Sequence, residues 1–531
     1  MVLKGNMFNQ RLTSTFLHRS VIFFAIIIGC MLQMACRNTP HTPGIFSVKT
    51  FGAKGDSSTL DTKAIQEAID AAEKAGGGTV VLTPGVYSSG TLFLKSNVTL
   101  RVEAGAVLKG SPRLEDYTAL TWGHNNDRQP YHLLVAKDVH HITIEGAGII
   151  DGNGIAFWKD YDPAMDPQWI LAKEQKISPM LEVQNCTDVQ IRDVTLTTGG
   201  GWTVHLYDSE RIQVRGAKII NNVFAPNGDG IDISGCTDVV ISDCIIKTCD
   251  DAICLKTMVD SKECKRITVT NCIIECSCAA LKIGNESFRD ISQVVFSNCV
   301  IYNSSRAFAV YAESAGTVED IIVDNIVTDS KTPLLFNRPI HLSLYMPEPG
   351  AGSRNGDWMF KEGKQWNYEG RKPRLRNITI TNFHATTQGR ILMTAGEGYM
   401  IENLTLRNVV LTYPWIENPE ARIDSVKSSQ FAPVRREAKM AKAAIVAENI
   451  QNFFLDHVTI NWPETDTIPS DWFFNRKIAN GTLTPFYDTA RQARQADFSV
   501  LWGRNIPGAI INMPFAKASS LSLPVKDIKI R

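Results

Sequence analysis

The sequence has no excess of charge of either sign and no cysteine–histidine pattern typical of a zinc site. Lysine plus arginine and aspartate plus glutamate both number 55, so the formal net charge is zero. A neutral chain lacks the basic surface on which nucleic-acid binding depends, so no nucleic-acid partner is expected. It also lacks a global field that would attract an acidic polymer. Any recognition of an acidic substrate must therefore be local.

The apolar run nearest the N-terminus is short for a membrane span. Basic residues precede this run at 21–28, and Ala35-Cys36 follows it. A small residue directly before cysteine at this place resembles a bacterial lipoprotein cleavage site. We therefore expect a lipoprotein signal peptide over 1–36, lipid on Cys36 as the sole membrane attachment, and a tether over 37–44. The protein would then be a periplasmic or cell-surface outer-membrane lipoprotein; an ordinary secretory signal or a helical anchor is the alternative.

Short alternating runs, each ended by asparagine or aspartate, repeat along the chain. They include Val239 to Asp243, and the terminal residues Asp243, Asn271, Asn298 and Asn325 follow one another at steps of 28, 27 and 27 residues. The runs are rich in β-branched residues, which is typical of strands separated by polar turns. A fixed period in the twenties with one strand pattern per turn indicates a solenoid.

Leucine-rich repeats share this period, but their leucine framework is absent here. We therefore predict an all-β fold, a single-stranded right-handed parallel β-helix, with neighbouring strands about 4.8 Å apart. Helical periodicity over 62–75, ending at three glycines, predicts an N-terminal helix that caps the open end of the core. The solenoid is expected over 45–464. Residues 465–531 have no visible repeat and are expected to pack on it as a C-terminal extension.

Ten of the twelve cysteines lie in the stretch from Cys186 to Cys299, and six of these ten form two predicted columns. An inward-facing ladder of small apolar side chains is the favoured interpretation, since free cysteine is among the most buried residue types. Disulfides stay possible in an oxidising compartment. The columns are Cys244, Cys272, Cys299 and Cys186, Cys236, Cys264.

Three aspartates lie about one repeat apart, in Asn227-Gly228-Asp229 and in Asp250-Asp251. In a coil they would stack into one cluster, and closely placed carboxylates with different environments are what acid–base cleavage of a glycosidic bond needs. Crowding raises the pKa of one of them and keeps it protonated near neutral pH. Solvated turn carboxylates are the alternative. The intervals of 24, 21, 29 and 27 residues predict one column or patch of His205, Asp229, Asp250, Ala279 and Arg306.

Further motifs accompany the aspartates: Phe51-Gly52-Ala53-Lys54-Gly55-Asp56, Asp151-Gly152-Asn153-Gly154 and Trp202-Thr203-Val204-His205. Together they resemble glycoside hydrolase family 28, the polygalacturonase family, over roughly residues 47–410. The resemblance implies a pectin-lyase-like solenoid and an inverting glycoside hydrolase that needs no cofactor or metal. It implies that Asp251 is the general acid and that Asp229 and Asp250 activate water.

The resemblance and the predicted geometry suggest substrate-binding residues around the trio: Trp202, His205, Asn227, Lys256, Lys282 and Arg306. For His205 the alternative is a packed, satisfied histidine. For the two lysines it is a charge that counters the aspartates, and for Trp202 it is a place in the core.

Two departures from the family pattern bear on the substrate. The family's Gly-His-Gly and Ser-Ile-Gly elements correspond to 278–284, where the histidine is missing and Lys282 replaces a serine. In the predicted register, Phe308 and Val310 stand where the family's Arg-Ile-Lys element has its two cations. We therefore expect a monomeric enzyme that acts on pectic or other acidic poly- or oligosaccharide, with exo action or action on rhamnogalacturonan favoured. A β-helix lyase and a non-catalytic glycan-binding lipoprotein are the alternatives.

Overall fold

The computed structural model describes residues 44–120, 128–162, 169–331, 337–346, 371–419, 436–465, 476–478, 481–483, 498–513, 521–522 and 529–530. Residues from Ile45 onward form one compact unit, which begins where the solenoid was predicted to begin. The predicted signal peptide, Cys36 and residues 37–43 of the tether lie outside the described residues. Within the described ranges, no helix has the length and apolar character needed to cross a membrane.

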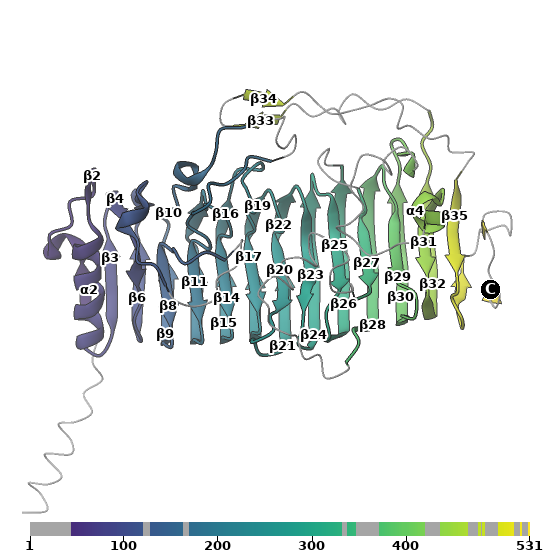
Figure 1. Cartoon of the computed structure of the whole chain (residues 1–531), viewed down its shortest axis with the longest axis horizontal. Helices are drawn as coiled ribbons and strands as arrows, with labels where there is room; N and C mark the ends of the chain where they lie inside the picture. Colours follow the sequence, from purple (N-terminus) through teal and green to yellow (C-terminus); the bar gives the residue numbers. More distant parts are fainter. Residues whose placement is uncertain are drawn as a thin grey trace, which may run out of the picture. The chain divides into compact units, whose positions relative to one another are not determined.

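One face of the coil is a 13-stranded sheet in which each strand pairs in parallel with the strand of the next coil. Figure 1 shows these strands following one another along the coil axis. In chain order they are β5 (Leu92–Phe93), β8 (Leu134–Lys137), β11 (Leu181–Gln184), β14 (Val204–Tyr207), β17 (Ile231–Ser234), β20 (Ile253–Thr257), β23 (Ala279–Ser287), β25 (Arg306–Ala312), β27 (Ile340–Leu344), β29 (Ile391–Ala395), β31 (Ala443–Glu448), β35 (Ser499–Arg504) and β37 (Leu521–Ser522).

The rest of each coil belongs to a 23-stranded sheet that holds two parallel ladders. One ladder runs through β3 (Gly78–Leu82), β6 (Val98–Val102), β9 (His140–Glu145), β12 (Thr187–Arg192), β15 (Glu210–Arg215), β18 (Thr237–Ser242) and β21 (Cys264–Thr270). The other runs through β2 (Asp56–Leu60), β4 (Gly85–Ser89), β7 (Ala106–Gly110), β10 (Ile149–Asp151), β13 (Thr195–Thr197), β16 (Lys218–Ile220), β19 (Ile245–Thr248) and β22 (Ile273–Cys276). The ladders then join in long strands: β24 (Ile291–Tyr302), β26 (Thr317–Ser330), β28 (Arg374–Thr387), β30 (Ile401–Thr412) and β32 (Ile450–Asn461).

Smaller elements complete the described chain. They are β1 (Gly44–Ser47), the 3-10 helices η1 (Val48–Phe51), η2 (Leu114–Asp116) and η3 (Gly154–Phe157), the antiparallel hairpin of β33 (Arg476–Ile478) and β34 (Gly481–Leu483), and the terminal strands β36 (Ile510–Asn512) and β38 (Lys529–Ile530). The predicted all-β parallel β-helix is confirmed.

The polar residues that end the repeating runs turn the chain at each corner. Asp243, Asn271, Asn298 and Asn325 all have φ between 54° and 59°, in the left-handed region. Asparagine and aspartate tolerate this conformation better than other residues with a Cβ. The amides also stack, since the Asn325 side chain donates a hydrogen bond to Asn298 Oδ1 at 2.7 Å. The repeat in the sequence is therefore a repeat of turns.

The ten cysteines from Cys186 to Cys299 are all free and buried. Within the second predicted column, Ser209 occupies the coil between Cys186 and Cys236, because its Oγ accepts a hydrogen bond from the Cys186 amide at 2.9 Å. The Ser209 amide in turn lies 3.4 Å from Cys236 Sγ. The small apolar ladder is thus confirmed, with one serine in it.

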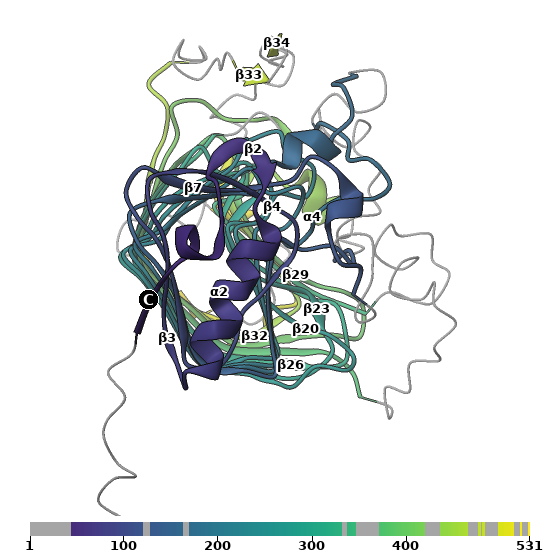
Figure 2. The ribbon, with the colours of Figure 1, turned by 90° about the vertical axis from the view of Figure 1, so that its left-hand side faces the viewer.

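The predicted capping helix is α2 (Thr62–Lys74). It buries Ile65, Ala68, Ile69 and Ala72, which recur at the helical period. Figure 2 looks onto the end of the coil, and α2 lies across its opening. The helix covers the first coils, so that apolar side chains at the end of the core are not exposed to water.

The predicted boundary at residue 464 is not a boundary of the solenoid. Strand β35 pairs with β31 and β36 pairs with β32, so the coil continues through 498–513. Within the coil, the short helix α4 (Arg436–Met440) comes directly before β31, which is a ladder strand. Sequence periodicity failed beyond residue 464 because a single short strand between long insertions has too few residues to reveal a period.

Candidate active site

The three aspartates lie at the N-terminal ends of two consecutive strands of the 13-stranded sheet, in the turns that lead into these strands. Asp229 precedes β17, and Asp250 and Asp251 precede β20. Asp229 and Asp251 are 3% and 2% exposed, whereas Asp250 is half-buried. Parallel pairing of β17 with β20 places the two turns next to each other, so the predicted cluster forms.

The predicted single column is in fact two rows. The Thr203, Gly230 and Ala252 amides donate equivalent hydrogen bonds to the carbonyls of Asp229, Asp251 and Ala279, and Ala279 aligns with Arg306. This first row therefore holds Asp229, Asp251, Ala279 and Arg306 on consecutive coils. His205 belongs to a second row, three positions along the strand, with Asp232, Cys254 and Lys282. Equal spacing in sequence cannot separate neighbouring rows, because coil lengths vary by several residues.

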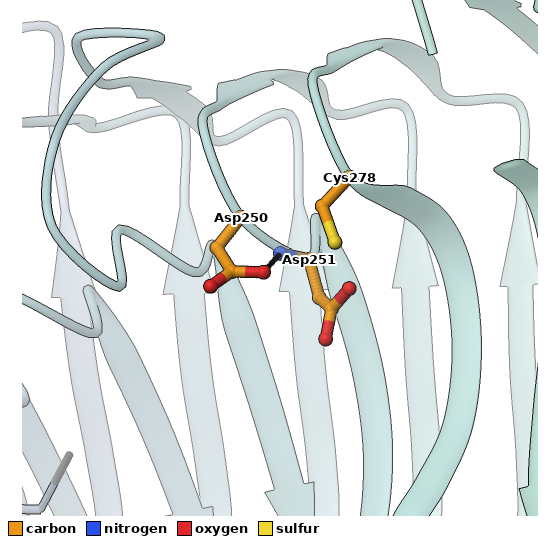
Figure 3. Close-up of side chains that lie close together, drawn as sticks. All are labelled: Asp250, Asp251 and Cys278. Atoms are coloured by element: carbon orange, nitrogen blue, oxygen red, sulfur yellow. Dashed lines mark hydrogen bonds between the residues drawn. The ribbon is translucent and has the colours of Figure 1, made fainter. Parts of the chain in front are cut away.

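Asp250 is outside both rows, and one of its carboxylate oxygens faces the backbone nitrogen of Asp251 (Figure 3). The Asp251 amide donates a hydrogen bond to Asp250 Oδ1 at 3.1 Å, which fixes the turn. Cys278, from the next coil, brings its Sγ within 4.8 Å of a carboxylate oxygen of each aspartate. The two neighbouring aspartates therefore meet different surroundings, as the sequence suggested.

Two cations come from the coils that follow the aspartates in the chain. Lys282 Nζ is 2.5 Å from Asp251 Oδ2, and both side chains are almost fully buried. Arg306 is 1% exposed and donates a hydrogen bond to Cys278 Sγ. Lys282 also lies over the Tyr311 ring, 5.6 Å from its centroid. These contacts bring Lys282 and Arg306 to the cluster as predicted, but Lys282 already has a carboxylate partner within the protein.

The charges around the trio separate the pKa values of its members. Burial and the neighbouring Asp250 raise the pKa of Asp229 well above its usual range. Burial and Asp251 likewise raise the pKa of Asp250. Burial also acts to raise the pKa of Asp251, but Lys282 and Lys256 outweigh it, so the pKa of Asp251 is lowered. Asp251 is therefore the ionised member, and Asp229 and Asp250 hold protons more readily.

His205 and Trp202 are structural neighbours of the site. His205 is fully buried, with Nδ1 2.9 Å from Glu182 Oε2 and Nε2 3.0 Å from Ser234 Oγ. Trp202 is 2% exposed and contacts the His205 ring edge-on at 5.3 Å. Both ring nitrogens of His205 thus have protein partners, and this favours the packed, satisfied histidine over a sugar-binding one.

Lys256 is buried between carboxylates. Its Nζ lies 3.6 Å from Asp232 Oδ1, 3.4 Å from Glu286 Oε2 and 4.5 Å from the centroid of the Trp202 ring. Asp232 lies in β17 and is fully buried. Lys256 is thus close to the trio, yet its ammonium faces protein groups.

The turn at Asn227 leaves no room for a side chain at the next residue. Asn227 is exposed and left-handed, with φ 48°. Gly228 follows it, and a Cβ there would lie only 2.7 Å from Cys249 Sγ. The Gly228 amide instead donates a hydrogen bond to this sulfur at 3.1 Å. Cys249 therefore takes the space of a side chain at 228.

The predicted register at 306–310 is wrong by one residue. Phe308 and Val310 are fully buried in the core, and the Phe308 ring contacts Phe296 at 5.8 Å. Lys282 aligns with Ala309, so the outward positions of β25 are Ala309 and Tyr311. Side chains alternate between faces of a strand, and a slip of one residue exchanges them. The two family cations are absent from the outward positions as well.

The sequence interpretation missed Glu182 and Arg128. Glu182 is fully buried, forms an ion pair with Arg128, and aligns with His205 across β11 and β14. Alignment of the run 181–184 with 204–207 would have revealed Glu182 as the neighbour of His205. Arg128 had no such signal, because it lies outside the repeating strands.

Asp250, Asp251 and Cys278 could in principle ligate a metal ion, since one atom of each lies within 4.8 Å of the others. However, Lys282 already neutralises Asp251, and Arg306 already donates to Cys278. A cation there would be repelled by these two positive groups. The donor set therefore fits the acid–base arrangement better than a metal centre.

Residues 84–338 match the family model of glycosyl hydrolases family 28. Over this stretch, just under half of the chain, the sequence is similar to this family. Among curated proteins, it is 30% identical over 223 residues to a probable polygalacturonase of Vitis vinifera, covering 40% of the chain and 44% of the relative. It is also 30% identical over 260 residues to an exo-poly-alpha-D-galacturonosidase of Dickeya chrysanthemi, covering 40% and 42%. The chain thus spans less than half the length of these relatives.

Solved structures share the fold of this chain. The family 28 exopolygalacturonase of Yersinia enterocolitica superimposes with a TM-score of 0.62 at 19% identity, over 88% of this chain and 78% of that one. The polygalacturonase of Erwinia carotovora ssp. carotovora gives a TM-score of 0.52 at 18% identity, over 71% and 93%. At these identities the likeness concerns the parallel β-helix.

Proposed function

We propose that this protein is a family 28 glycoside hydrolase that cleaves α-galacturonosidic or related bonds in pectic polysaccharide or its oligosaccharides. The observation that carries the proposal is the cluster of Asp229, Asp250 and Asp251 at neighbouring strands, in which Lys282 pairs with Asp251 while burial raises the pKa values of Asp229 and Asp250. Acid–base cleavage of a glycosidic bond requires one carboxylic acid and one carboxylate at the same bond. The curated relatives are polygalacturonases, which supports the pectic substrate.

In the proposed mechanism Asp250 donates the proton to the leaving oxygen. Asp250 is the half-buried member, and its pKa is raised by burial and by Asp251. The resemblance assigned this role to Asp251, but the ion pair with Lys282 favours its ionised form, and a general acid must carry a proton. The surroundings of the two aspartates therefore support the opposite assignment.

Asp251 then serves as the base that activates water. Asp229, which lies in register with Asp251 on the preceding coil, binds the same water. An oxygen of Asp250 lies within 4.8 Å of one of Asp251, which leaves little room for a water directly between these two groups. We propose that the water lies toward Asp229, whose buried Oδ1 has no hydrogen-bond partner among the described residues. A water that attacks the sugar from the side opposite the leaving oxygen would invert the anomeric carbon, and proton NMR of the first-formed anomer tests this part of the proposal.

Exo action is the finer part of the proposal. The Dickeya chrysanthemi relative is described as an exo-enzyme, and the outward positions Ala309 and Tyr311 lack the cations of the family's Arg-Ile-Lys element. The lyase alternative is disfavoured, because ion pairing raises the pKa of both Lys256 and Lys282 despite their burial, and a protonated lysine cannot act as a base.

A product assay tests the activity. The parent chain and Asp250→Asn are incubated side by side with polygalacturonan, rhamnogalacturonan and their oligosaccharides, and products are separated by size. We expect the parent to release a single small sugar that the variant does not release. Random internal cuts would contradict exo action, unsaturated products absorbing in the ultraviolet would indicate a lyase, and glycan binding without turnover would indicate a binding protein.

We also propose that the protein is a lipid-anchored protein of the bacterial envelope. The support is the apolar run at 21–28 followed by Ala35-Cys36. Cells grown with labelled palmitate are expected to label the parent chain and not Cys36→Ala. Equal labelling of both would contradict the anchor, and unlabelled parent chain in the periplasm would favour an ordinary secretory signal.

A further inference from the structure

The buried cluster of Asp232, Lys256 and Glu286 lies next to the proposed catalytic residues but takes no part in the mechanism above. Its members are at most 6% exposed and come from three consecutive strands, β17, β20 and β23. Burying one cation with two carboxylates is costly unless the geometry is useful, since each ion loses its hydration. Both oxygens of Asp232 and Oε2 of Glu286 have no hydrogen-bond partner among the described residues. Fold stability alone is therefore a poor reason for this cluster.

The ammonium group of Lys256 is held from three sides. Asp232 and Glu286 approach it at 3.6 Å and 3.4 Å, and the face of Trp202 covers it at 4.5 Å. An ammonium over an indole face is stabilised by the ring electrons, more strongly when water is excluded. A side chain held in this way points its charge at a fixed place and is poorly placed to leave for a substrate carboxylate.

The charge of Lys256 acts on all three proposed catalytic carboxylates. This charge acts to lower the pKa of Asp229, Asp250 and Asp251, whereas burial acts more strongly in the opposite direction on each of them. The other groups facing Lys256 are Asp232, Glu286 and the Cys254 thiol, while Lys282 and His205 lie nearby on β23 and β14. Around the trio, five carboxylates thus share the two buried lysines and Arg306.

On the basis of the proposed function, we propose that Lys256 is a positioning residue, clamped by Asp232, Glu286 and Trp202, that sets the charge of the catalytic aspartates without binding the substrate. This differs from the role expected from sequence, in which Lys256 pairs with a substrate carboxylate. The two roles predict different kinetics, because a binding group changes KM and a group that tunes acid and base changes kcat and its pH profile.

The test compares kcat, KM and the pH profile of kcat/KM for Lys256→Met and Lys256→Arg on the pectic oligosaccharide that the parent hydrolyses. Without the positive charge, the pKa values of the trio rise, so both limbs of the profile move to higher pH for Lys256→Met. We expect kcat to fall about 10- to 100-fold with little change in KM, since a mistuned acid–base pair loses part of its contribution. Arginine keeps the charge and should keep both limbs in place.

Two further variants separate tuning from structural damage. Glu286→Gln removes a negative charge beside the same lysine, so this variant should have a lower kcat. The limbs of its pH profile should stay in place or move to lower pH. Lys247→Met removes a half-exposed lysine paired with Glu275 at 2.8 Å on another face of the coil, and should change nothing. If the cluster had only a structural role, Lys256→Met and Glu286→Gln would shift the limbs of the pH profile in the same direction.

The outcomes are distinct from those of the proposed function. If the parent hydrolyses a pectic substrate and Lys256→Met raises KM alone, with an unchanged pH profile, Lys256 binds substrate and the positioning role is overturned while the hydrolase stands. If Lys256→Met does not fold, the comparison of the parent with Glu286→Gln still tests the positioning role, provided that these two proteins unfold at the same temperature. A parent that hydrolyses no pectic substrate overturns the proposed function itself.

Discussion

Asp250→Asn is expected to lower kcat on a pectic substrate by about 10²- to 10⁴-fold, the usual contribution of a positioned acid or base. The amide keeps the shape of the side chain and the hydrogen bond that Asp250 Oδ1 accepts from the Asp251 amide, but it has no acidic proton to donate. Steady-state kinetics with the parent and the variant measure the loss. KM should change little, because the proton is needed only as the bond breaks.

The same experiment distinguishes the two assignments of the acid. A substrate with a good leaving group needs no proton from the protein, so it should restore much of the rate to Asp250→Asn and little to Asp251→Asn. The reverse pattern would return the role of acid to Asp251. Asp238→Asn is the matched control, because Asp238 is half-exposed and pairs with Arg266 at 2.6 Å away from the site, so this variant should retain full activity.

The pH profile of the parent follows from the same charges. Activity requires ionised Asp251, whose pKa is lowered by Lys282 and Lys256 against the effect of burial, so activity should persist into acid. It also requires protonated Asp250, whose pKa is raised by burial and Asp251, so activity should be lost as the pH rises through that value. Replacement of Asp250 by asparagine should remove the alkaline limb and leave the acid limb.

Phe308→Ala is expected to destabilise the fold by about 3–5 kcal/mol, the usual cost of removing a buried aromatic ring. Phe308 belongs to β25, the strand that also carries Arg306. Its side chain is fully buried and contacts Phe296 inside the coil. Deletion of the ring leaves a cavity that a solenoid closes poorly, because its coils are held in register by both sheets. Urea unfolding should show a lower midpoint with an unchanged slope.

This prediction also tests the corrected register of β25. If Phe308 occupied an outward, substrate-facing position, as the sequence suggested, its removal would affect KM and leave stability within about 0.5 kcal/mol, as for a surface site. Val327→Ala is the control for stability, because Val327 is 53% exposed on the outer surface and should leave the midpoint unchanged.

Much of this protein was predictable from sequence because a solenoid is a local, repeating structure. The strand runs, the capping helix and the left-handed corners at Asp243 and Asn271 each depend on residues within one coil. The cysteine columns follow once the period is known, because one coil repeats the position of the last. The proximity of Asp229 to Asp250-Asp251 follows from the same period.

Only the tertiary structure decided how neighbouring rows of side chains face one another. It placed Asp251 rather than Asp250 in line with Asp229, turned Phe308 into the core, and brought Lys282 against Asp251. Coil lengths vary by a few residues, and an error of a single residue exchanges the faces of a strand. The charge of each aspartate depends on contacts between coils, which no spacing along the chain specifies.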